Sequence, residues 1–400
     1  MWAVRMEEGF IGVLSRQYSS RAILNRMHQG PSLPVPVLFA CHTLGPGGTE
    51  RQMTEMAKHL DRERFSPHVM AFHTEGFRAE ELRAARVPVT RLPVRSLRDS
   101  SVLSGAIVLR RYLREHSIRI VHPFDYPTVT FITPLARWFG TPVVLSSSRG
   151  ERALFPPFYQ RALRWTDGLV DGIVVNSPFC VQELVNVYGV AKERIYLAPN
   201  GVDTDRFQPS EPDVPSELAG ASLVIGAVSV LRPEKSLETL IDAFALVADR
   251  HPDWRLLIAG GGGHEATLRQ RAAALTAAGR CVFLPSCRDV APYYRALDVF
   301  VLPSVSEAFS NALLEAMAAG ITAVASSAGG NPHILRHGEN GFLFPSGDSA
   351  VLAAQLEQLG TDPGLRQRLA LAARREVEQR YSLRVAADRL SEVYDGFLAR

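Results

Sequence analysis

Residues 299–320 read VFVLPSVSEAFSNALLEAMAAG. The run Val299–Leu302 is short and wholly apolar, which is typical of a buried strand, and Ser310 is a residue type favoured at the start of a helix. This places Glu307 in the loop before the helix and Glu315 in its second turn. A helix start attracts phosphate through its free N–H groups, and carboxylates accept hydrogen bonds from sugar hydroxyls. The stretch therefore predicts a strand-loop-helix unit that binds phosphate and sugar hydroxyls. The plainer alternative is that Glu315 only stabilises the first helical turn and Glu307 is solvated.

The same alternation of apolar strands and amphipathic helices extends outward over the rest of the chain from residue 35. A turn-rich passage, Pro199–Pro212, divides it into two halves. The pattern predicts strands at 35–41, 67–72, 118–122, 142–146, 171–176 and 193–198, then at 223–228, 255–259, 281–284, 298–302, 321–325 and 342–344. Helices between short strands indicate parallel sheets, and the pattern at 236–249 has the spacing of one buried helix face. We therefore expect two doubly wound Rossmann-like α/β domains facing each other across a cleft that holds the ligands.

Composition narrows the class of protein. The 400 residues exceed what one hydrophobic core usually supports, and a net charge of +3 is too small to indicate a nucleic-acid partner. The four cysteines form no C-x-x-C pair and no dense disulfide framework, which favours a reducing compartment. No apolar run approaches the length needed to span a bilayer. Residues 1–34 lack the continuous apolar segment of a signal peptide. We expect either a disordered leader there or a misassigned start, with Met27 as the alternative start.

A glycine-rich loop follows the first predicted strand. Residues 43–52 read TLGPGGTERQ, which has Glu50 where a dinucleotide fingerprint needs its third glycine, and no Gly-Lys-Ser/Thr of a P-loop follows. Gly47 and Gly48 still let backbone N–H groups approach a bound oxygen closely. On this loop alone, a plain strand-to-helix turn is the preferred interpretation.

Two cations lie beyond the first strand of the second half, in Leu231-Arg-Pro-Glu-Lys-Ser236. Arg232 and Lys235 would face the mouth of the cleft, where cations can neutralise the charge that builds on a departing diphosphate. Taken by itself, this segment is an ordinary surface loop.

Together these segments occur in an order that resembles the retaining family-4 glycosyltransferases, which have the GT-B fold, over nearly all of residues 35–400. The resemblance is carried by the loop at 47–50, Pro199-Asn-Gly-Val-Asp203, the Arg-Pro-Glu-Lys loop, the E-x7-E pair Glu307 and Glu315, and Gly338-Glu-Asn-Gly-Phe342. It implies an N-terminal acceptor-binding domain at 35–205 and a C-terminal nucleotide-sugar-binding domain at 206–380. It also implies a C-terminal helix at 381–400 that packs back toward the N-terminal domain.

The resemblance further implies roles for particular residues. The ligand would be a UDP-, GDP- or ADP-linked sugar. Glu315 would bind its ribose hydroxyls and Glu307 would bind its sugar hydroxyls. The backbone amides near Ser310 and Asn311 would bind its phosphates. Lys235, helped by Arg232, would stabilise the leaving diphosphate, with Gly47 and Gly48 closing on it. Family members keep the anomeric configuration, commonly by a front-face route, and Glu307 as a covalent nucleophile is the less favoured alternative.

Some positions depart from the family pattern and concern the acceptor. Arg149 stands where many members have histidine; it cannot act as a base, so we expect it to bind an acceptor phosphate or carboxylate. Val230 replaces a frequent arginine, and His333 a usual glutamate. His122 ends a first-half strand, where an acceptor-binding role and a structural role are equally favoured.

The pair Asp203-Thr-Asp205 looks like a D-x-D metal motif, but it follows Asn200-Gly201 in the linker, where aspartates favour turns. We interpret it as structural and expect neither a metal nor a cofactor.

The resemblance therefore implies a cytoplasmic retaining glycosyltransferase that acts on a glycan or lipid-linked acceptor. By resemblance alone, we expect its setting to be bacterial surface polysaccharide or lipopolysaccharide biosynthesis. A GT-B-fold sugar-nucleotide epimerase and a catalytically silent sugar-nucleotide-binding partner remain as alternatives. The arginine-rich region 83–119 and the basic, aromatic stretch 155–165 are either solvated helix faces or a peripheral contact with the anionic cytoplasmic face of a membrane.

Overall fold

The structure, a computed structural model, describes residues 33–211 and 215–400, and the predicted leader lies almost wholly outside them. The described chain divides into two compact units. Of the described residues, the first unit comprises 33–147, 162–173 and 387–400, and the second comprises 148–161, 174–211 and 215–386.

A seven-stranded sheet forms the first half, in the order β3-β2-β1-β4-β5-β6-β7. Its strands are β1 (Val35–Cys41), β2 (Phe65–Ala71), β3 (Val89–Arg91), β4 (Ile120–Pro123), β5 (Val143–Ser148), β6 (Gly172–Val175) and β7 (Ile195–Leu197). The pairings from β3 through β5 are parallel. The helices between them are α2 (Gly48–His59), α3 (Phe77–Ala84), α4 (Ser101–Glu115), α5 (Tyr126–Trp138), α6 (Pro157–Thr166) and α7 (Pro178–Asn186).

A six-stranded parallel sheet forms the second half, in the order β10-β9-β8-β11-β12-β13. Its strands are β8 (Leu223–Val228), β9 (Trp254–Ala259), β10 (Cys281–Leu284), β11 (Val299–Leu302), β12 (Thr322–Ser326) and β13 (Phe342–Phe344). Its helices are α8 (Leu237–Ala248), α9 (Glu265–Arg271), α10 (Ala273–Ala277), α11 (Ala291–Arg295), α12 (Asn311–Ala318), α13 (Ser349–Thr361) and α14 (Pro363–Arg380). Helix α15 (Leu383–Leu398) follows α14.

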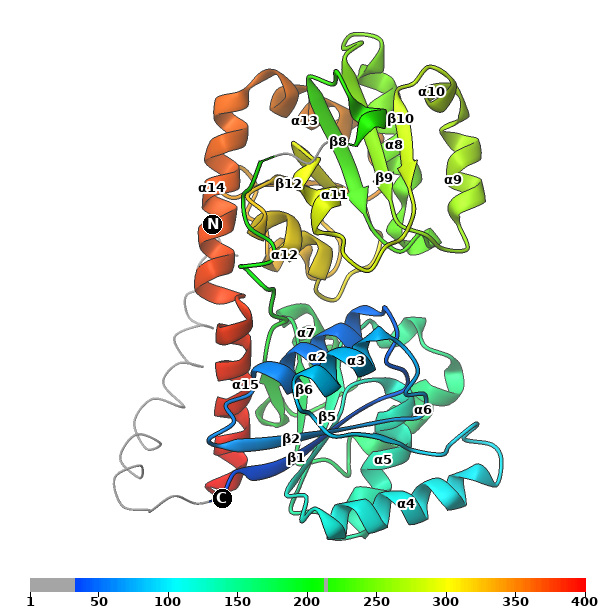
Figure 1. Cartoon of the computed structure of the whole chain (residues 1–400), viewed down its shortest axis with the longest axis vertical. Coiled ribbons are helices and arrows are strands. Elements are labelled where there is room, and N and C mark those ends of the chain that lie inside the picture. The colour runs from blue at the N-terminus through cyan, green and yellow to red at the C-terminus, as the bar shows by residue number, and fades with distance from the viewer. Residues whose placement is uncertain (1–32, 212–214) are drawn as a thin grey trace. The chain divides into compact units, whose positions relative to one another are not determined.

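Helices cover both faces of the second sheet, as Figure 1 shows. Alternate residues of one strand therefore enter different cores: Leu223 and Ile225 of β8 pack with α8 and α13, whereas Val224 packs with α12 and α14. Strands buried on both faces have continuous apolar sequences, which is why each was recognisable as a short apolar run. The predicted doubly wound α/β class is confirmed.

Both sheets reverse their strand order at one position, between β1 and β4 in the first and between β8 and β11 in the second. Loops that leave the carboxyl ends of such neighbouring strands diverge to opposite faces of the sheet and leave a crevice, where ligands bind in open α/β sheets. Most candidate residues follow three of these strands: the glycine-rich loop follows β1, the loop with Arg232 and Lys235 follows β8, and the segment from Glu307 to Glu315 follows β11. His122 lies within β4, and Arg149 follows β5.

Candidate functional site

The loops after β8 and β11 are joined directly at the order reversal of the second sheet. The backbone N–H of Val305 donates to the carbonyl of Glu234 at 2.9 Å. On the β8 side, the chain forms a single 3-10 turn, Pro233–Lys235, and Ser236 adopts a left-handed conformation with φ 48°. This turn brings Lys235 across to the β11 loop.

Lys235 and Glu307 form a largely buried ion pair. The Lys235 Nζ lies 2.5 Å from Glu307 Oε1, and the side chains are 20% and 10% exposed. Ser304 Oγ donates to the same carboxylate oxygen at 2.9 Å. The Glu307 carboxylate is thus fixed in position by two donors from two different loops, a relation that their spacing in the sequence could not reveal.

Two glycines after β12 hold the backbone of Glu307 in place. The Gly330 N–H donates to the Glu307 carbonyl at 2.7 Å. Gly329 has φ 54°, and a Cβ there would lie 2.0 Å from the same carbonyl oxygen. Glycine is required at 329 both for its left-handed backbone and for this close approach.

Helix α12 starts as predicted. Ser310 is its N-cap, and the Ser310 Oγ accepts a hydrogen bond from the Leu313 N–H at 3.3 Å. Asn311 is therefore the first helical residue, and Glu315 lies in the second turn with its side chain buried. The start of α12 directly follows the loop that carries Glu307, so the free N–H groups of this helix end lie near the Lys235 and Glu307 pair.

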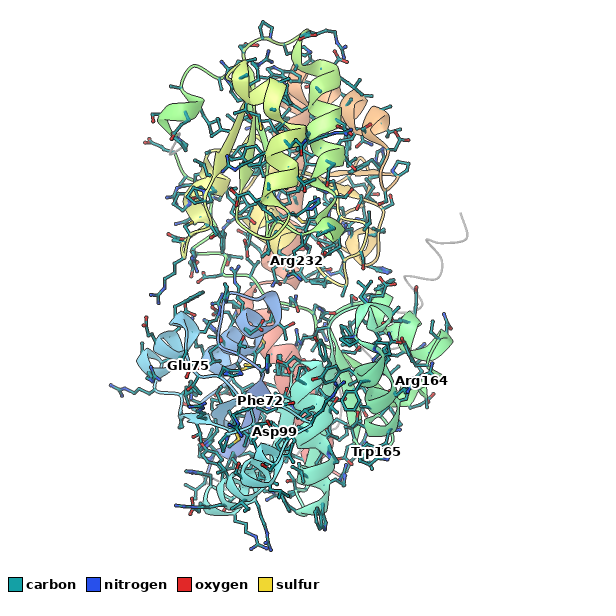
Figure 2. The ribbon with its side chains drawn as sticks, turned by 90° about the vertical axis from the view of Figure 1, so that its right-hand side faces the viewer. Phe72, Glu75, Asp99, Arg164, Trp165 and Arg232 are labelled. Carbon is teal, nitrogen blue, oxygen red and sulfur yellow. The ribbon has the colours of Figure 1, made fainter. Side chains whose placement is uncertain are left out.

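Arg232 lies in the same loop after β8 as Lys235, and Figure 2 labels it. Its guanidinium is 3.3 Å from the carboxylate of Glu234, and both side chains are well exposed. The glycines that follow β9 pack against the same turn, because a Cβ at Gly262 would meet the Leu231 carbonyl. These glycines therefore serve the packing of the turn that carries Arg232 and Lys235.

An amide bridge connects Arg149 to the start of α12. Asn200 is buried; its Oδ1 accepts from Arg149 at 2.8 Å, and its Nδ2 donates to Asn311 Oδ1 at 2.7 Å. A second link joins the same segments, from Ser306 Oγ to Glu151 Oε2 at 2.7 Å. The sequence analysis named Arg149 and Asn311 as site residues but missed Asn200, Glu151 and Ser306. For Asn200 the sequence signal was its position within the Pro199–Asp203 motif. Glu151 and Ser306 belong to none of the motifs that carry the family resemblance.

The glycine-rich loop belongs to the first unit and begins α2 at Gly48. Gly47 is the N-cap residue, and a Cβ at this position would overlap the carboxyl of Glu50. Glu50 Oε1 accepts from Thr43 Oγ1 at 3.2 Å, so the carboxyl braces the loop from within. Burial raises the pKa of Glu50, and nearby Asp125 raises it further.

His122 of β4 is fully buried in the first unit. Its Nδ1 lies 2.8 Å from the Tyr394 hydroxyl and its Nε2 lies 2.9 Å from Ser147 Oγ. With both ring nitrogens engaged by protein hydroxyls, this arrangement favours the structural role over the acceptor-binding role.

The Asp203-Thr-Asp205 motif forms a turn. Asp203 Oδ1 accepts from the backbone N–H groups of Asp205 at 3.1 Å and Arg206 at 2.9 Å. The carboxylate therefore serves the local backbone, as expected of an aspartate in a linker.

Two family models match the chain. Residues 46–206 match "Glycosyltransferase Family 4" and residues 213–376 match "Glycosyl transferases group 1". One relative is a D-inositol 3-phosphate glycosyltransferase of Streptomyces bingchenggensis, 30% identical over 57% of this chain and 53% of that protein. Another is a GDP-mannose-dependent alpha-(1-6)-phosphatidylinositol monomannoside mannosyltransferase of Mycolicibacterium smegmatis, 28% identical over 72% of this chain and 79% of that protein. The chain thus spans about half the length of the first of these relatives.

Among solved structures, Anabaena Alr3699/HepE in complex with UDP-glucose has a TM-score of 0.78 at 22% identity, covering 90% of this chain and 99% of that one. This similarity establishes the fold. Because the two models together match most of both halves, and the fold is that of GT-B enzymes, the chain belongs to the family-4 glycosyltransferases.

Proposed function

We propose that this protein is a retaining glycosyltransferase that transfers a sugar from a nucleotide-diphosphate sugar to a glycan or lipid-linked acceptor. The observation that carries the proposal is the placement of the Lys235 and Glu307 pair beside the start of α12 at the order reversal of the second sheet. This arrangement offers a cation and a helix end for a diphosphate, with a carboxylate for sugar hydroxyls.

Each residue has a role that its contacts support. Lys235 and Arg232 neutralise the departing diphosphate, and the amides at Ser310 and Asn311 bind its oxygens. Glu307 accepts hydrogen bonds from the sugar, and Glu315, buried on α12, accepts them from the ribose. For Gly47 and Gly48 we keep the role that the family resemblance implies, donor binding through their backbone amides.

In the proposed front-face reaction, the acceptor oxygen forms a bond to the anomeric carbon on the side from which the diphosphate leaves. The bond from that carbon to the phosphate oxygen breaks, and the leaving phosphate takes the acceptor proton. Lys235 stabilises the negative charge on the leaving oxygen. We favour this route over covalent catalysis by Glu307 because Glu307 Oε1 already accepts hydrogen bonds from Lys235 and Ser304.

The nucleotide part of the donor is UDP, GDP or ADP. The Anabaena structure contains UDP-glucose, and the mycobacterial relative is named as GDP-mannose-dependent. Uridine and guanosine nucleotides therefore both occur as donors or ligands among similar proteins. For the acceptor we retain Arg149, whose guanidinium suits a phosphate or carboxylate. We leave His122 out because both of its nitrogens bind protein hydroxyls. Bacterial surface polysaccharide or lipopolysaccharide assembly is the proposed setting.

A thermal-shift panel with UDP, GDP, ADP, CMP and NAD tests the donor site. A ligand at a hundred times its dissociation constant stabilises the folded protein by about 2.7 kcal/mol. One nucleoside diphosphate should stabilise the wild type, and Lys235→Ala and Glu315→Ala should lose this shift. Arg269→Ala, which removes an exposed cation from α9, is the matched control and should retain it. Stabilisation by NAD alone would contradict the proposal.

Product analysis with the identified donor separates the alternatives. A transferase extends an acceptor with retained configuration, an epimerase isomerises the sugar nucleotide, and a silent partner does neither. We expect transfer to continue in EDTA, since the proposed reaction assigns its charge stabilisation to Lys235, Arg232 and backbone amides.

We further propose that the first unit contacts an anionic membrane through one face of α4 and the end of α5. Leu103 and Ile107 of α4 are 67% and 69% exposed, and Trp138 of α5 is 80% exposed. Arg110 continues the α4 face and lies over the ring of Phe139, next to Trp138. Apolar side chains flanked by arginines are suited to insertion at an anionic lipid surface.

This surface differs in part from the sequence-based one. Of the stretch 155–165, Figure 2 labels Arg164 and Trp165, which extend from α6, and Trp165 is 60% exposed. Among residues 33–211 and 215–400, no helix is long and apolar enough to cross a bilayer. Flotation with phosphatidylglycerol vesicles at low salt tests the contact: Ile107→Asp should release the protein, whereas Leu371→Asp, an exposed leucine of α14, should not. Absence of wild-type binding would refute it.

A further inference from the structure

Asn200 lies between the residue proposed to bind the acceptor and the helix end proposed to bind the donor phosphates. Its side chain is buried and makes a 2.8 Å hydrogen bond with Arg149 and a 2.7 Å hydrogen bond with Asn311. The Nδ2 group also lies 3.4 Å from the carbonyl of Phe309. All of these residues belong to the second unit.

The chemistry of these groups fixes how both amides are oriented. An arginine side chain can only donate hydrogen bonds, so the carbonyl oxygen of Asn200 must face Arg149. The NH₂ group of Asn200 then faces Asn311, where it needs an acceptor. The Asn311 amide must therefore present its oxygen to Asn200 and direct its own NH₂ group away from it.

That direction matters because Asn311 is the first residue of α12. An NH₂ group at a helix start adds a donor for a phosphate oxygen, whereas an amide oxygen in the same place repels it. The segment that carries Arg149 is also held at a second point, by the hydrogen bond from Ser306 to Glu151. The bridge is thus part of a supported connection between residues 149–151 and 306–311.

We propose that Asn200 is a positioning residue that sets the amide of Asn311 for the donor diphosphate and at the same time holds Arg149 for the acceptor. The inference rests on the proposed function. Because one amide serves both, a nucleoside diphosphate that binds the Asn311 NH₂ group reinforces the orientation of Asn200 and hence of Arg149. Donor and acceptor affinities are then linked, and linkage of this kind is reciprocal.

Asn200→Asp tests the orientation. The aspartate still accepts from Arg149 but has no donor for Asn311, so the Asn311 amide turns its NH₂ group toward the new carboxylate and its oxygen toward the phosphate. A lost hydrogen bond to a charged group corresponds to about a tenfold weaker affinity or more. We expect that loss for the stabilising nucleoside diphosphate, measured by calorimetry without acceptor, and no loss for the parent nucleoside.

A double-mutant cycle with Asn311→Ala separates orientation from general damage. Without an amide at 311 there is nothing to turn, so Asn200→Asp should then change the diphosphate affinity less than twofold. Asn186→Asp, the same change at an exposed asparagine of α7, is the matched control and should leave the affinity unchanged.

Arg149→Met provides a second variant should Asn200→Asp fold poorly. Removing the Arg149 donor weakens the orientation of the Asn200 amide, which then depends on the long 3.4 Å contact with the Phe309 carbonyl and on Asn311 itself. Diphosphate affinity without acceptor should therefore fall, and this fall should also vanish in the Asn311→Ala background. A residue that only binds acceptor would leave this affinity unchanged. Equal losses for nucleoside and diphosphate, or losses that persist in the Asn311→Ala background, overturn the inference. Failure of the wild type to bind any nucleoside diphosphate instead refutes the proposed function.

Discussion

Replacing Gly329 with alanine should displace Glu307 although the two residues are far apart in sequence. Gly329 has φ 54°, and an added Cβ would lie 2.0 Å from the carbonyl oxygen of Glu307. The atom it meets belongs to the backbone, so no side-chain rotation can relieve the overlap. The Glu307 loop must move away from β12.

The size of the effect follows from two contributions. A left-handed backbone costs an alanine about 1 kcal/mol. Movement of the loop also breaks the 2.7 Å hydrogen bond from the Gly330 N–H to the Glu307 carbonyl, and burying an unsatisfied backbone group costs about 1–3 kcal/mol. We therefore expect Gly329→Ala to lower the free energy of unfolding by about 2–4 kcal/mol.

Gly347→Ala is the matched control because Gly347 has φ 83° and open space around its Cβ position. It carries only the backbone contribution and should cost about 1 kcal/mol. Urea denaturation of both variants and the wild type measures the difference, and sugar transfer should fall strongly only in Gly329→Ala. Equal stability losses in the two alanine variants, with transfer intact, would refute the assigned contact between Gly329 and Glu307.

Three further predictions concern charge and protonation. Glu307→Gln should raise the affinity for the nucleoside diphosphate, because the phosphate no longer competes with a carboxylate for Lys235. The same change should lower the rate of sugar transfer about a hundredfold. Calorimetry measures the affinity and turnover measures the rate, with exposed Glu265→Gln as the control. Alkylation by iodoacetamide at pH 7.5 should add a single label, at exposed Cys287, because Cys41, Cys180 and Cys281 are buried. Burial also raises the pKa of Cys180 to about 11 and of Cys281 to about 12, so few of these thiols ionise at that pH. The intact mass after labelling counts the adducts. Burial lowers the pKa of His68 to about 4, so below pH 6.5 the unfolded chain binds a proton at this histidine that the folded protein does not bind. The free energy of unfolding should therefore fall between pH 6.5 and pH 4, by at most about 3 kcal/mol. Urea titrations at each pH measure this fall, which should be smaller in His68→Gln.

The architecture could be predicted because buried parallel strands leave a direct trace in the sequence. The strands expected at 35–41, 223–228, 281–284 and 342–344 have those bounds in the structure. The one that was missed, β3 (Val89–Arg91), is a three-residue edge strand with no fully buried position. A strand that pairs with a single neighbour can form without an apolar run. The hydrophobic pattern alone therefore cannot identify such a strand.

The candidate site was predictable only where local sequence determines it. The Ser310 cap and the position of Glu315 in the second turn follow from helix geometry and were expected. The pairing of Lys235 with Glu307 depends on the adjacency of β8 and β11, which spacing along the chain does not contain. The bridge at Asn200 is less accessible still, because its role depends on which end of an amide faces which neighbour.

The charges of the second unit suggest how its site selects a complete donor. Both cations already have acidic neighbours: Arg232 lies beside Glu234 on the exposed side, and Lys235 is paired with Glu307 in a largely buried position. Exposed pairs contribute little, so Arg232 can turn to an incoming phosphate at small cost. Drawing Lys235 away from Glu307 is more costly, because it leaves a buried carboxylate with fewer donors. A nucleoside diphosphate without sugar can pair with Lys235 but donates no hydrogen bond to Glu307. A nucleotide sugar offers a phosphate that pairs with Lys235 and also hydroxyls that donate hydrogen bonds to Glu307. We therefore expect the pair to favour ligands that carry both groups, since only they restore hydrogen bonds to both side chains at once.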